Sequence, residues 1–229
     1  IGKCRYGLML NEDGMVYDDG VTTRLDENHY IMTTTTGGAA TVLGKLEDYL
    51  QTEWPDLDVY LTSVTDHYAT ISVCGPNSKK IIQKVIPEID LSDKNFPHMS
   101  FKNSKIGKVK CRVMRISFTG EQSYEINIQA NYAKSVWENC MEAGKEFNIK
   151  PFGGRALMSM RLEKNWGAWT LDYRPDFTAK ETGLDMFINW DKDFIGKEKA
   201  KSENSSNKLT PLIVETNDID VTNNEAVMN

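Results

Sequence analysis

The chain has 229 residues, of which 40% are hydrophobic and 26% charged, and its formal net charge is -6 at pH 7. This length can bury a substantial core in one large or two smaller domains. The acidic balance, without a stripe of Lys and Arg, argues against nucleic acid as the main partner, because backbone binding depends on clustered cations. The apolar runs fall far short of the roughly 20 residues that span a bilayer, so we expect no integral membrane protein.

The cysteines limit the kinds of metal and redox site that the chain could hold. The four cysteines lie far apart without a C-x-x-C pair, and there are only three histidines, so the usual zinc and redox spacings are missing. We therefore expect reduced structural thiols, no metal site and a cytoplasmic location.

The two ends of the chain suggest a fragment. Because the chain opens at Ile1 in an apparent internal strand and ends soon after a new strand begins, we expect a fragment of a longer protein. Proteolytic trimming or a cleaved tag is the alternative.

A β-hairpin is the strongest local prediction near the start. Asp13-Gly14 separates the apolar runs 6–10 and 15–21, and a two-residue turn of this composition has both residues at positive φ. Asp18 and Asp19 then lie on the return strand, where neighbouring side chains point to opposite faces. They cannot readily converge on one metal ion. One of them is expected to face a cavity, the alternative being that each is solvated or bonded to a turn.

The pattern then predicts an α+β fold. A strand at 29–36 ends at Gly37-Gly38, and a helix follows up to Trp54-Pro55. Strands are expected at 59–63 and 69–74. The first domain is expected to consist of residues 1–58 and a returning segment at 151–200, with a split βαβ (ferredoxin-like) subdomain between them at 59–150. A linker is expected at 201–208. A new module is expected at 209–229, and its first element is a strand at 209–214.

A second turn, at Gly120, precedes a strand of alternating apolar and polar residues. Glu125 is one of the polar residues, so it points away from the apolar face and is expected to face outward or into a cleft. A solvated position is the alternative for Glu125 and for Glu121 in the turn.

Residues 152–166 are predicted to form a helix on which Arg155, Ser159 and Glu163 share a face, with the apolar residues packing inward. Arg155 has the planar fork that binds ligand carboxylates, and a helix-surface ion pair is its alternative role. On residue type alone, Trp169 is more often a core or lid residue than a stacking platform. The residues by themselves thus predict an acidic, partly aromatic pocket with a carboxylate-binding arginine.

Five segments carry a family resemblance through their order and spacing. They are Tyr6–Asp19 (YGLMLNEDGMVYDD), Cys74–Asn77 (CGPN), Phe118–Ile126 (FTGEQSYEI), Met160–Lys164 (MRLEK) and Asp193–Lys197 (DFIGK). Together they resemble the glycine cleavage T-protein (aminomethyltransferase) family over nearly the whole chain. Thr33–Ala40 and Tyr49–Pro55 are more similar to the folate-binding half of the sarcosine oxidase alpha subunit, and Arg161–Trp169 and Tyr173–Thr178 to dimethylglycine and sarcosine dehydrogenases.

This resemblance implies a T-protein-like folate-binding fold, with a tetrahydrofolate site at the centre of a three-part ring of domains. It also implies that the N-terminal strands and most of the C-terminal β-barrel lie outside this chain. By similarity Asp18 is the catalytic carboxylate, Tyr6 and Glu125 contact the pterin, and Arg155 meets the folate tail. Thr34, Glu121 and Trp169 complete the implied folate-binding set, although Thr34 stands where relatives often have Asn.

The implied function is one-carbon transfer. FAD in a separate domain or subunit would oxidise an N-methyl amine such as sarcosine or dimethylglycine, and this module would capture the carbon as 5,10-methylenetetrahydrofolate. The alternative is an aminomethyltransferase of the glycine cleavage system, whose partner is a lipoyl-carrier protein. A non-enzymatic folate-binding branch of the family carries a K-G-C-Y-x-G-Q-E motif that is absent here. The expected partners are folate and a flavin domain or subunit, with neither nucleic acid nor a membrane.

Overall fold

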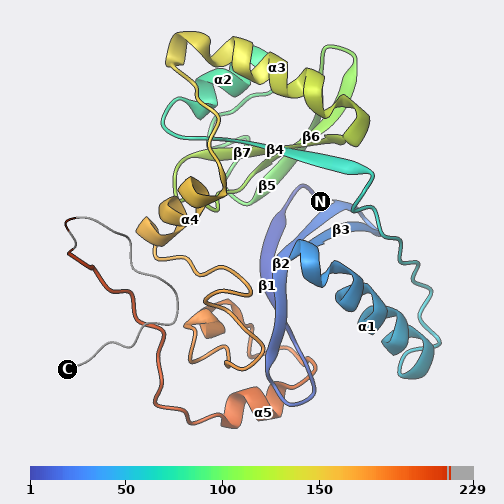
Figure 1. Cartoon of the computed structure of the whole chain (residues 1–229). Helices are drawn as coiled ribbons and strands as arrows, with labels where there is room; N and C mark the ends of the chain where they lie inside the picture. The colour runs from blue at the N-terminus through green and yellow to red at the C-terminus, as the bar shows by residue number, and fades with distance from the viewer. Residues whose placement is uncertain (216, 218–229) are drawn as a thin grey trace.

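The computed structural model describes residues 1–215 and 217, which form two antiparallel sheets and their covering helices (Figure 1). The three-stranded sheet has the order β1-β2-β3, and the four-stranded sheet has the order β4-β7-β6-β5. The two sheets meet where the start of β1 approaches β5, through a bridge between Lys3 and Ser100. In the described part of the chain, no helix has the length and apolarity to cross a membrane.

The first sheet contains the predicted hairpin. Its strands are β1 (Cys4–Leu10), β2 (Val16–Asp26) and β3 (His29–Thr34). The turn differs from the prediction, because Gly14 has a φ of 78° whereas Asp13 does not have positive φ. The side-chain oxygen of Asn11 accepts hydrogen bonds from the N–H groups of Asp13 and Met15. This Asx turn reverses the chain with one left-handed residue instead of two.

The helix predicted after the glycine pair is confirmed. A 3-10 turn η1 (Thr36–Gly38) leads into α1 (Ala39–Thr52), which packs along one face of the first sheet. The strand expected at 59–63 is wrong: this stretch is irregular and belongs to the connection between α1 and β4. No neighbouring strand pairs with it, and Tyr60 is 91% exposed, so its high β propensity finds no ladder in the described structure.

The second layer has the predicted composition of antiparallel strands with two helices on one face (Figure 1). Its strand order differs from a split βαβ unit, in which the strands flanking a helix run parallel with one strand between them. Here β4 and β5 flank α2, run antiparallel and lie at opposite edges of the sheet. The elements are β4 (Tyr68–Cys74), α2 (Ser78–Val85), β5 (Ser100–Ile106), β6 (Val109–Arg115), β7 (Ser123–Gln129), η2 (Ala130–Tyr132), α3 (Ala133–Gly144) and η3 (Lys145–Phe147).

The remaining segment returns to the first sheet through α4 (Gly154–Glu163). The helix is formed as predicted. Its apolar residues do not all pack inward, because Leu162 is 56% exposed while Arg161 is buried. An irregular stretch with the 3-10 turn η4 (Leu184–Phe187) follows, and then α5 (Lys197–Ser202), which extends into the predicted linker. The strand expected at 209–214 is not formed, and the rest of that expected module, apart from 215 and 217, lies outside the described residues.

The start of α5 packs tightly on the tip of the β1–β2 hairpin. Gly196 has a φ of 77°, and a Cβ at this position would overlap the carbonyl oxygen of Asn11 and come within 2.9 Å of the Gly14 Cα. Ala200 completes the contact from the first turns of α5, beside the Gly14 backbone. Two glycines thus let the DFIGK segment dock on the hairpin without side chains between the backbones.

We predict that Gly196→Ala lowers the free energy of unfolding by at least about 2 kcal/mol, because it adds both a clash and a left-handed strain. Gly44→Ala is the matched control: Gly44 lies inside α1 with open space around its Cα, so alanine should stabilise by about 0.5–1 kcal/mol. Urea denaturation of both variants measures the difference. Equal stability of the two variants would show that the hairpin and α5 do not depend on this contact.

Candidate functional site

The strand register of the first sheet decides which acidic side chain faces the rest of the molecule. Asp19 lies opposite Leu8 in the β1–β2 ladder, and Tyr6 is two residues before Leu8 on the same strand, so all three share a face. Asp18 lies on the other face, toward α1, and Thr34 shares that face because it pairs with Gly20. The structure therefore brings Tyr6 together with Asp19 and separates it from Asp18.

The Tyr6 hydroxyl donates a hydrogen bond of 2.6 Å to Oδ2 of Asp19. Burial, followed by the charge of Asp19, raises the pKa of Tyr6 far above its ordinary value, so the phenol stays protonated as a donor. Burial also raises the pKa of Asp19, and the hydrogen bond from Tyr6 opposes this shift. The pair is a fixed carboxylate with one oxygen oriented by a phenol, on the face that packs against residues 166–194.

Four rings form an aromatic cluster around this pair: Tyr6, Trp166, Tyr173 and Phe187. The Tyr6 ring lies edge-on to Trp166 at a centroid distance of 5.2 Å and to Phe187 at 4.9 Å. Trp166 in turn meets Phe187 at 5.6 Å and Tyr173 at 6.3 Å. Such edge-to-face contacts hold ring orientations in place. The sequence analysis named Asp18, not Asp19, as the catalytic carboxylate, and it did not name Phe187, which belongs to none of the five segments.

Asp18, the predicted catalytic residue, is only 1% exposed and is bound by the backbone. Its Oδ1 accepts hydrogen bonds from the N–H groups of Asp19 (2.8 Å) and Thr35 (3.2 Å). Its Oδ2 faces Gly38, where a side chain would overlap the carboxylate. A carboxylate at the start of a helix is stabilised by the helix dipole and the free N–H groups there. In this structure Asp18 supports the turn into α1.

Glu125 approaches from the second sheet. Its neighbours Tyr124 and Ile126 are buried in the core beneath α2 and α3, so Glu125 points to the opposite face, toward β1, as the strand alternation predicted. Met114 lies opposite Glu125 in the β6–β7 ladder, so the two share a face, and Met114 packs against Cys4 of β1. The charge of Glu125 contributes to the raised pKa of Cys4. Burial raises the pKa of Glu125 to about 7. From the described residues the half-buried side chain of Glu125 receives no hydrogen bond, so its oxygens are acceptors available to donors from a ligand.

The three other predicted binding residues differ in their surroundings. Arg155 is exposed near the start of α4, and its side chain forms no ion pair with any described residue, so the alternative pair with Glu163 is not formed. Glu121 is exposed, and its carbonyl oxygen accepts a 2.6 Å hydrogen bond from Ser117. Trp169 is half-buried and packs against the core of the first sheet. Arg155 and Glu121 are thus exposed, whereas Trp169 packs against the same buried cluster as Tyr6 and Trp166.

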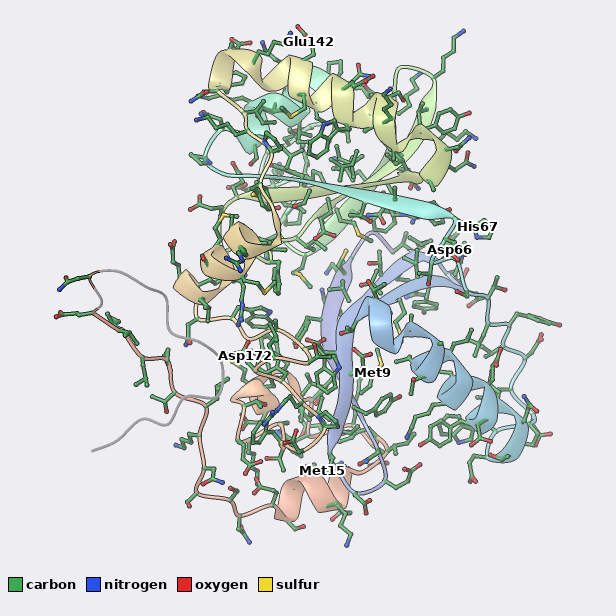
Figure 2. All side chains as sticks on the ribbon, viewed as in Figure 1. Met9, Met15, Asp66, His67, Glu142 and Asp172 are labelled. Carbon is green, nitrogen blue, oxygen red and sulfur yellow. The ribbon has the colours of Figure 1, made fainter. Side chains whose placement is uncertain are left out.

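A buried ion pair holds the loop that carries the cluster. Arg161 on α4 forms an ion pair with Asp172, and its guanidinium also donates a 3.0 Å hydrogen bond to the carbonyl oxygen of Trp166. Asp172 accepts a further hydrogen bond of 2.9 Å from the N–H of Ala168. Figure 2 shows Asp172 in the irregular segment between α4 and the first sheet. Arg161 stands in the MRLEK segment, but no spacing in the sequence indicated its burial.

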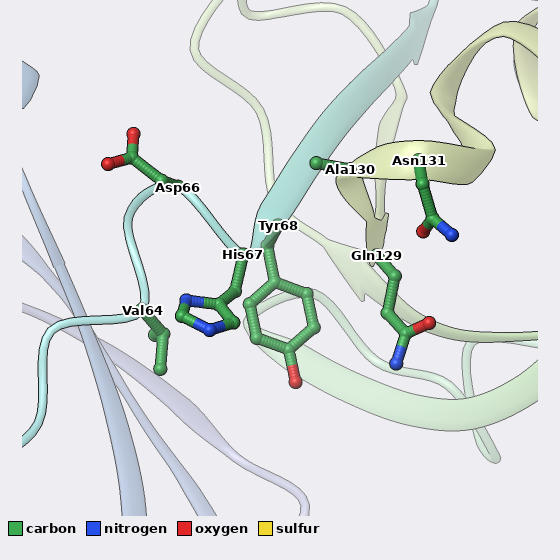
Figure 3. A pocket seen from close by; sticks show the side chains of 7 residues that line it. All are labelled: Val64, Asp66, His67, Tyr68, Gln129, Ala130 and Asn131. Carbon is green, nitrogen blue, oxygen red and sulfur yellow. The ribbon is translucent and has the colours of Figure 1, made fainter.

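A cavity of about 430 Å³ lies elsewhere, at the edge formed by β4 and β7 (Figure 3). The His67 and Tyr68 side chains stand next to each other in it, and Asp66 points away from them. None of the predicted site residues lines it: the lining residues are Val64, Asp66, His67, Tyr68, Gln129, Ala130 and Asn131. Among the described residues no group of three or more His, Cys, Asp or Glu side chains is placed to hold a metal ion.

Comparison with known proteins identifies the family. The model of the GCVT N-terminal domain matches residues 1–192. The chain belongs to this family. It is 43% identical over 206 residues to sarcosine oxidase subunit alpha of Corynebacterium sp. (strain P-1), covering 90% of this chain and 21% of that protein. It is 30% identical over 232 residues to human mitochondrial dimethylglycine dehydrogenase, covering 99% of this chain and 26% of that protein.

An aminomethyltransferase sequence and a solved structure are also similar to this chain. The aminomethyltransferase of Caldanaerobacter subterraneus subsp. tengcongensis is 32% identical over 208 residues, 89% of this chain and 54% of that protein. The crystal structure of the glycine cleavage system aminomethyltransferase T from Bartonella henselae superimposes with a TM-score of 0.74 at 21% identity, over 88% of this chain and 52% of that one. The chain thus has the T-protein fold and spans about a fifth to a quarter of the oxidase and dehydrogenase relatives.

We predict that Asp172→Asn lowers the free energy of unfolding by about 1–3 kcal/mol, because it leaves the buried guanidinium of Arg161 without its charge partner. Asp176→Asn is the control, since the Asp176–Arg174 pair is exposed and should contribute less than about 1 kcal/mol. Denaturation followed by tryptophan fluorescence reports both the free energy of unfolding of the protein and the environment of Trp166. Equal losses of unfolding free energy in the two variants would contradict the prediction that Asp172 holds this loop in place.

Proposed function

We propose that this chain is a tetrahydrofolate-binding module that accepts a one-carbon unit from a methylated amine, to give 5,10-methylenetetrahydrofolate. The observation that carries the proposal is the Tyr6–Asp19 hydrogen bond within the aromatic cluster. Glu125 lies on the face of the second sheet that packs against Cys4, two residues before Tyr6 on β1. Membership of a family that includes aminomethyltransferases supports the choice of folate.

The residues present suit the chemistry of a reduced pterin. A pterin is a flat ring whose amino-pyrimidine edge carries several N–H donors. The buried carboxyl of Glu125 lacks a donor from the described residues, and charge-assisted hydrogen bonds are about twice as strong as neutral ones. The rings of Tyr6 and Phe187 offer apolar contact area for the ring system. Glu125 would thus orient the pterin edge, while the aromatic cluster would exclude water from one side of it.

Asp19 is the carboxylate that we assign to the transfer step, in place of Asp18. Tetrahydrofolate, when bound, would supply the nucleophilic nitrogen atoms that accept the carbon. Asp19 would stabilise the positive charge that develops at the reacting nitrogen, because a fixed carboxylate in a partly dry site acts without reorganisation. Tyr6 holds its orientation through the 2.6 Å hydrogen bond. Asp18 lies on the opposite face of the sheet, where its Oδ1 accepts backbone N–H groups and its buried Oδ2 has no hydrogen-bond partner among the described residues.

The source of the one-carbon unit is inferred from the relatives. Sarcosine oxidase subunit alpha and dimethylglycine dehydrogenase are both named for oxidations of N-methyl amines, and both are far longer than this chain. We propose that a flavin-containing domain or subunit carries out that oxidation and supplies the carbon. The alternative is an aminomethyltransferase of the glycine cleavage system, supported by the relatives of that name. An assay of the full-length protein with sarcosine, dimethylglycine and an aminomethylated lipoyl carrier separates the two.

We predict that Asp19→Asn slows carbon transfer by on the order of 10²-fold in the full-length protein, because it removes the charge that faces the reacting nitrogen. Asp18→Asn is the matched control. It should lower thermal stability, through its loss of charge at the start of α1, and change turnover far less. Single-turnover rates and melting temperatures of both variants give the test. The reverse pattern, with turnover lost only in Asp18→Asn, would return the role to Asp18.

We predict that tetrahydrofolate binds more tightly as the pH rises from 6 to 8. The ligand favours the ionised form of Glu125, whose pKa in the free protein is about 7, so affinity should rise through that pH and level off above it. Glu125→Gln should bind more weakly and lose this part of the pH dependence, while staying folded because it removes a buried charge. Calorimetric titration at several pH values measures both. A pH dependence unchanged in Glu125→Gln would contradict its contact with the pterin.

A further inference from the structure

The cavity at the edge of β4 and β7 has a lining that suits a small organic molecule. Its volume is about 430 Å³, and the side chains of His67 and Tyr68 stand next to each other in it (Figure 3). Gln129 and Asn131 line it as well, and their side-chain amides can donate or accept hydrogen bonds. Asp66, the only carboxylate among the described residues of the lining, points away from the two rings. The cavity thus offers two rings and two neutral amides to a ligand.

Arg112 of β6 is a neighbour of this cavity through two of the lining residues. Its guanidinium carbon, Cζ, is 5.9 Å from the centre of the Tyr68 ring. Arg112 is paired with Asn127 in the β6–β7 ladder, and Gln129 is two residues after Asn127 on the same face of β7. Arg112 and Gln129 are therefore diagonal neighbours across the two strands. The guanidinium lies beside the wall that Tyr68 and Gln129 form.

The guanidinium of Arg112 lacks a counter-charge. Its Nε and Nη1 atoms are buried, and neither has a hydrogen-bond partner among the described residues. Glu125 is a diagonal neighbour of Arg112 on the other side, but no carboxylate of the described chain forms an ion pair with Arg112. The residue as a whole is only half-buried, so part of it is accessible to a ligand. A cation removed from water without a counter-charge is unfavourable, and an anion from a ligand would stabilise it.

Two lysines add to the positive charge of this face. Lys105 and Lys110 lie directly opposite each other in the β5–β6 ladder, and Arg112 is two residues after Lys110 on the same face. Like charges in opposite positions of an antiparallel pair repel each other. Neither lysine forms an ion pair with a carboxylate in the described part of the chain. The three cations together favour an anionic ligand beside them over a neutral or cationic one.

We propose that Arg112 and the cavity form a binding site for a small organic carboxylate. The carboxylate would accept hydrogen bonds from the guanidinium, whose planar shape matches it, and the apolar body of the ligand would lie against Tyr68 and His67. The volume of the cavity is large for an inorganic anion alone, which favours an organic one. The Tyr6–Asp19 pair takes no part in this site, so the inference does not depend on the function proposed above.

The test is calorimetric titration of the full-length protein with benzoate, with acetate, and with benzamide as the uncharged counterpart of benzoate. The wild type should bind benzoate more tightly than acetate, and benzamide at least about tenfold more weakly than benzoate. Arg112→Gln should weaken benzoate roughly tenfold and leave benzamide unchanged, and Arg112→Lys should restore part of the affinity. Tyr68→Ala should weaken benzoate but not acetate. Lys108→Gln, a charge loss in the exposed β5–β6 turn, is the matched control and should bind all three probes as the wild type does.

Melting temperatures give a check that is independent of calorimetry. Benzoate should raise the melting temperature of the wild type and have a smaller effect on Arg112→Gln. Without ligand, Arg112→Gln should melt at least as high as the wild type, because it removes a charge that has no counter-charge. A lower melting temperature of ligand-free Arg112→Gln would show that the fold itself uses this charge, which contradicts the proposal. Failure of the wild type to bind either carboxylate, or equal benzoate affinity in the wild type and Arg112→Gln, overturns the site.

Discussion

The antiparallel register of β1 and β2 is the constraint on which the site depends. Because side chains alternate between the faces of a strand, the register fixes Asp19 on the face of Tyr6 and Asp18 on the face of α1. A slip of one residue would exchange the two carboxylates. The hairpin tip protects this register through the Asn11 turn and through the docking of α5 on Gly14. Contacts at the far end of the hairpin thus decide which of the two acids lies beside Tyr6.

The proposed site draws on three separate segments, and each is held by its own interactions. The first sheet supplies Tyr6 and Asp19, the second sheet supplies Glu125, and the loop after α4 supplies Trp166. The Arg161–Asp172 ion pair ties that loop to α4, so the position of Trp166 relative to Tyr6 depends on a charge pair that is itself buried. A buried pair of this kind is costly to break, which makes it effective at fixing one loop conformation.

Electrostatics separates the roles of the acidic groups. Asp18 is held by backbone N–H groups at the start of α1, whereas burial raises the pKa of Glu125 to about 7 because it has no such donors. The contrast follows from the surroundings and not from residue type. One oxygen of Asp18 is thus bonded to the backbone while its Oδ2 is buried without a partner, and neither oxygen of the half-buried Glu125 accepts a hydrogen bond from the described residues.

The sequence by itself determined much of this protein: the hairpin, α1, the strands and helices of the second layer, the outward direction of Glu125 and, through five ordered segments, the family. Local propensity and alternation suffice for these because they are properties of neighbouring residues. Tertiary structure alone decided that Asp19 and not Asp18 meets Tyr6, that residues 59–63 stay unpaired, and that Arg161 is buried. Each of these depends on which distant segment packs against the residue, and no local pattern records that partner.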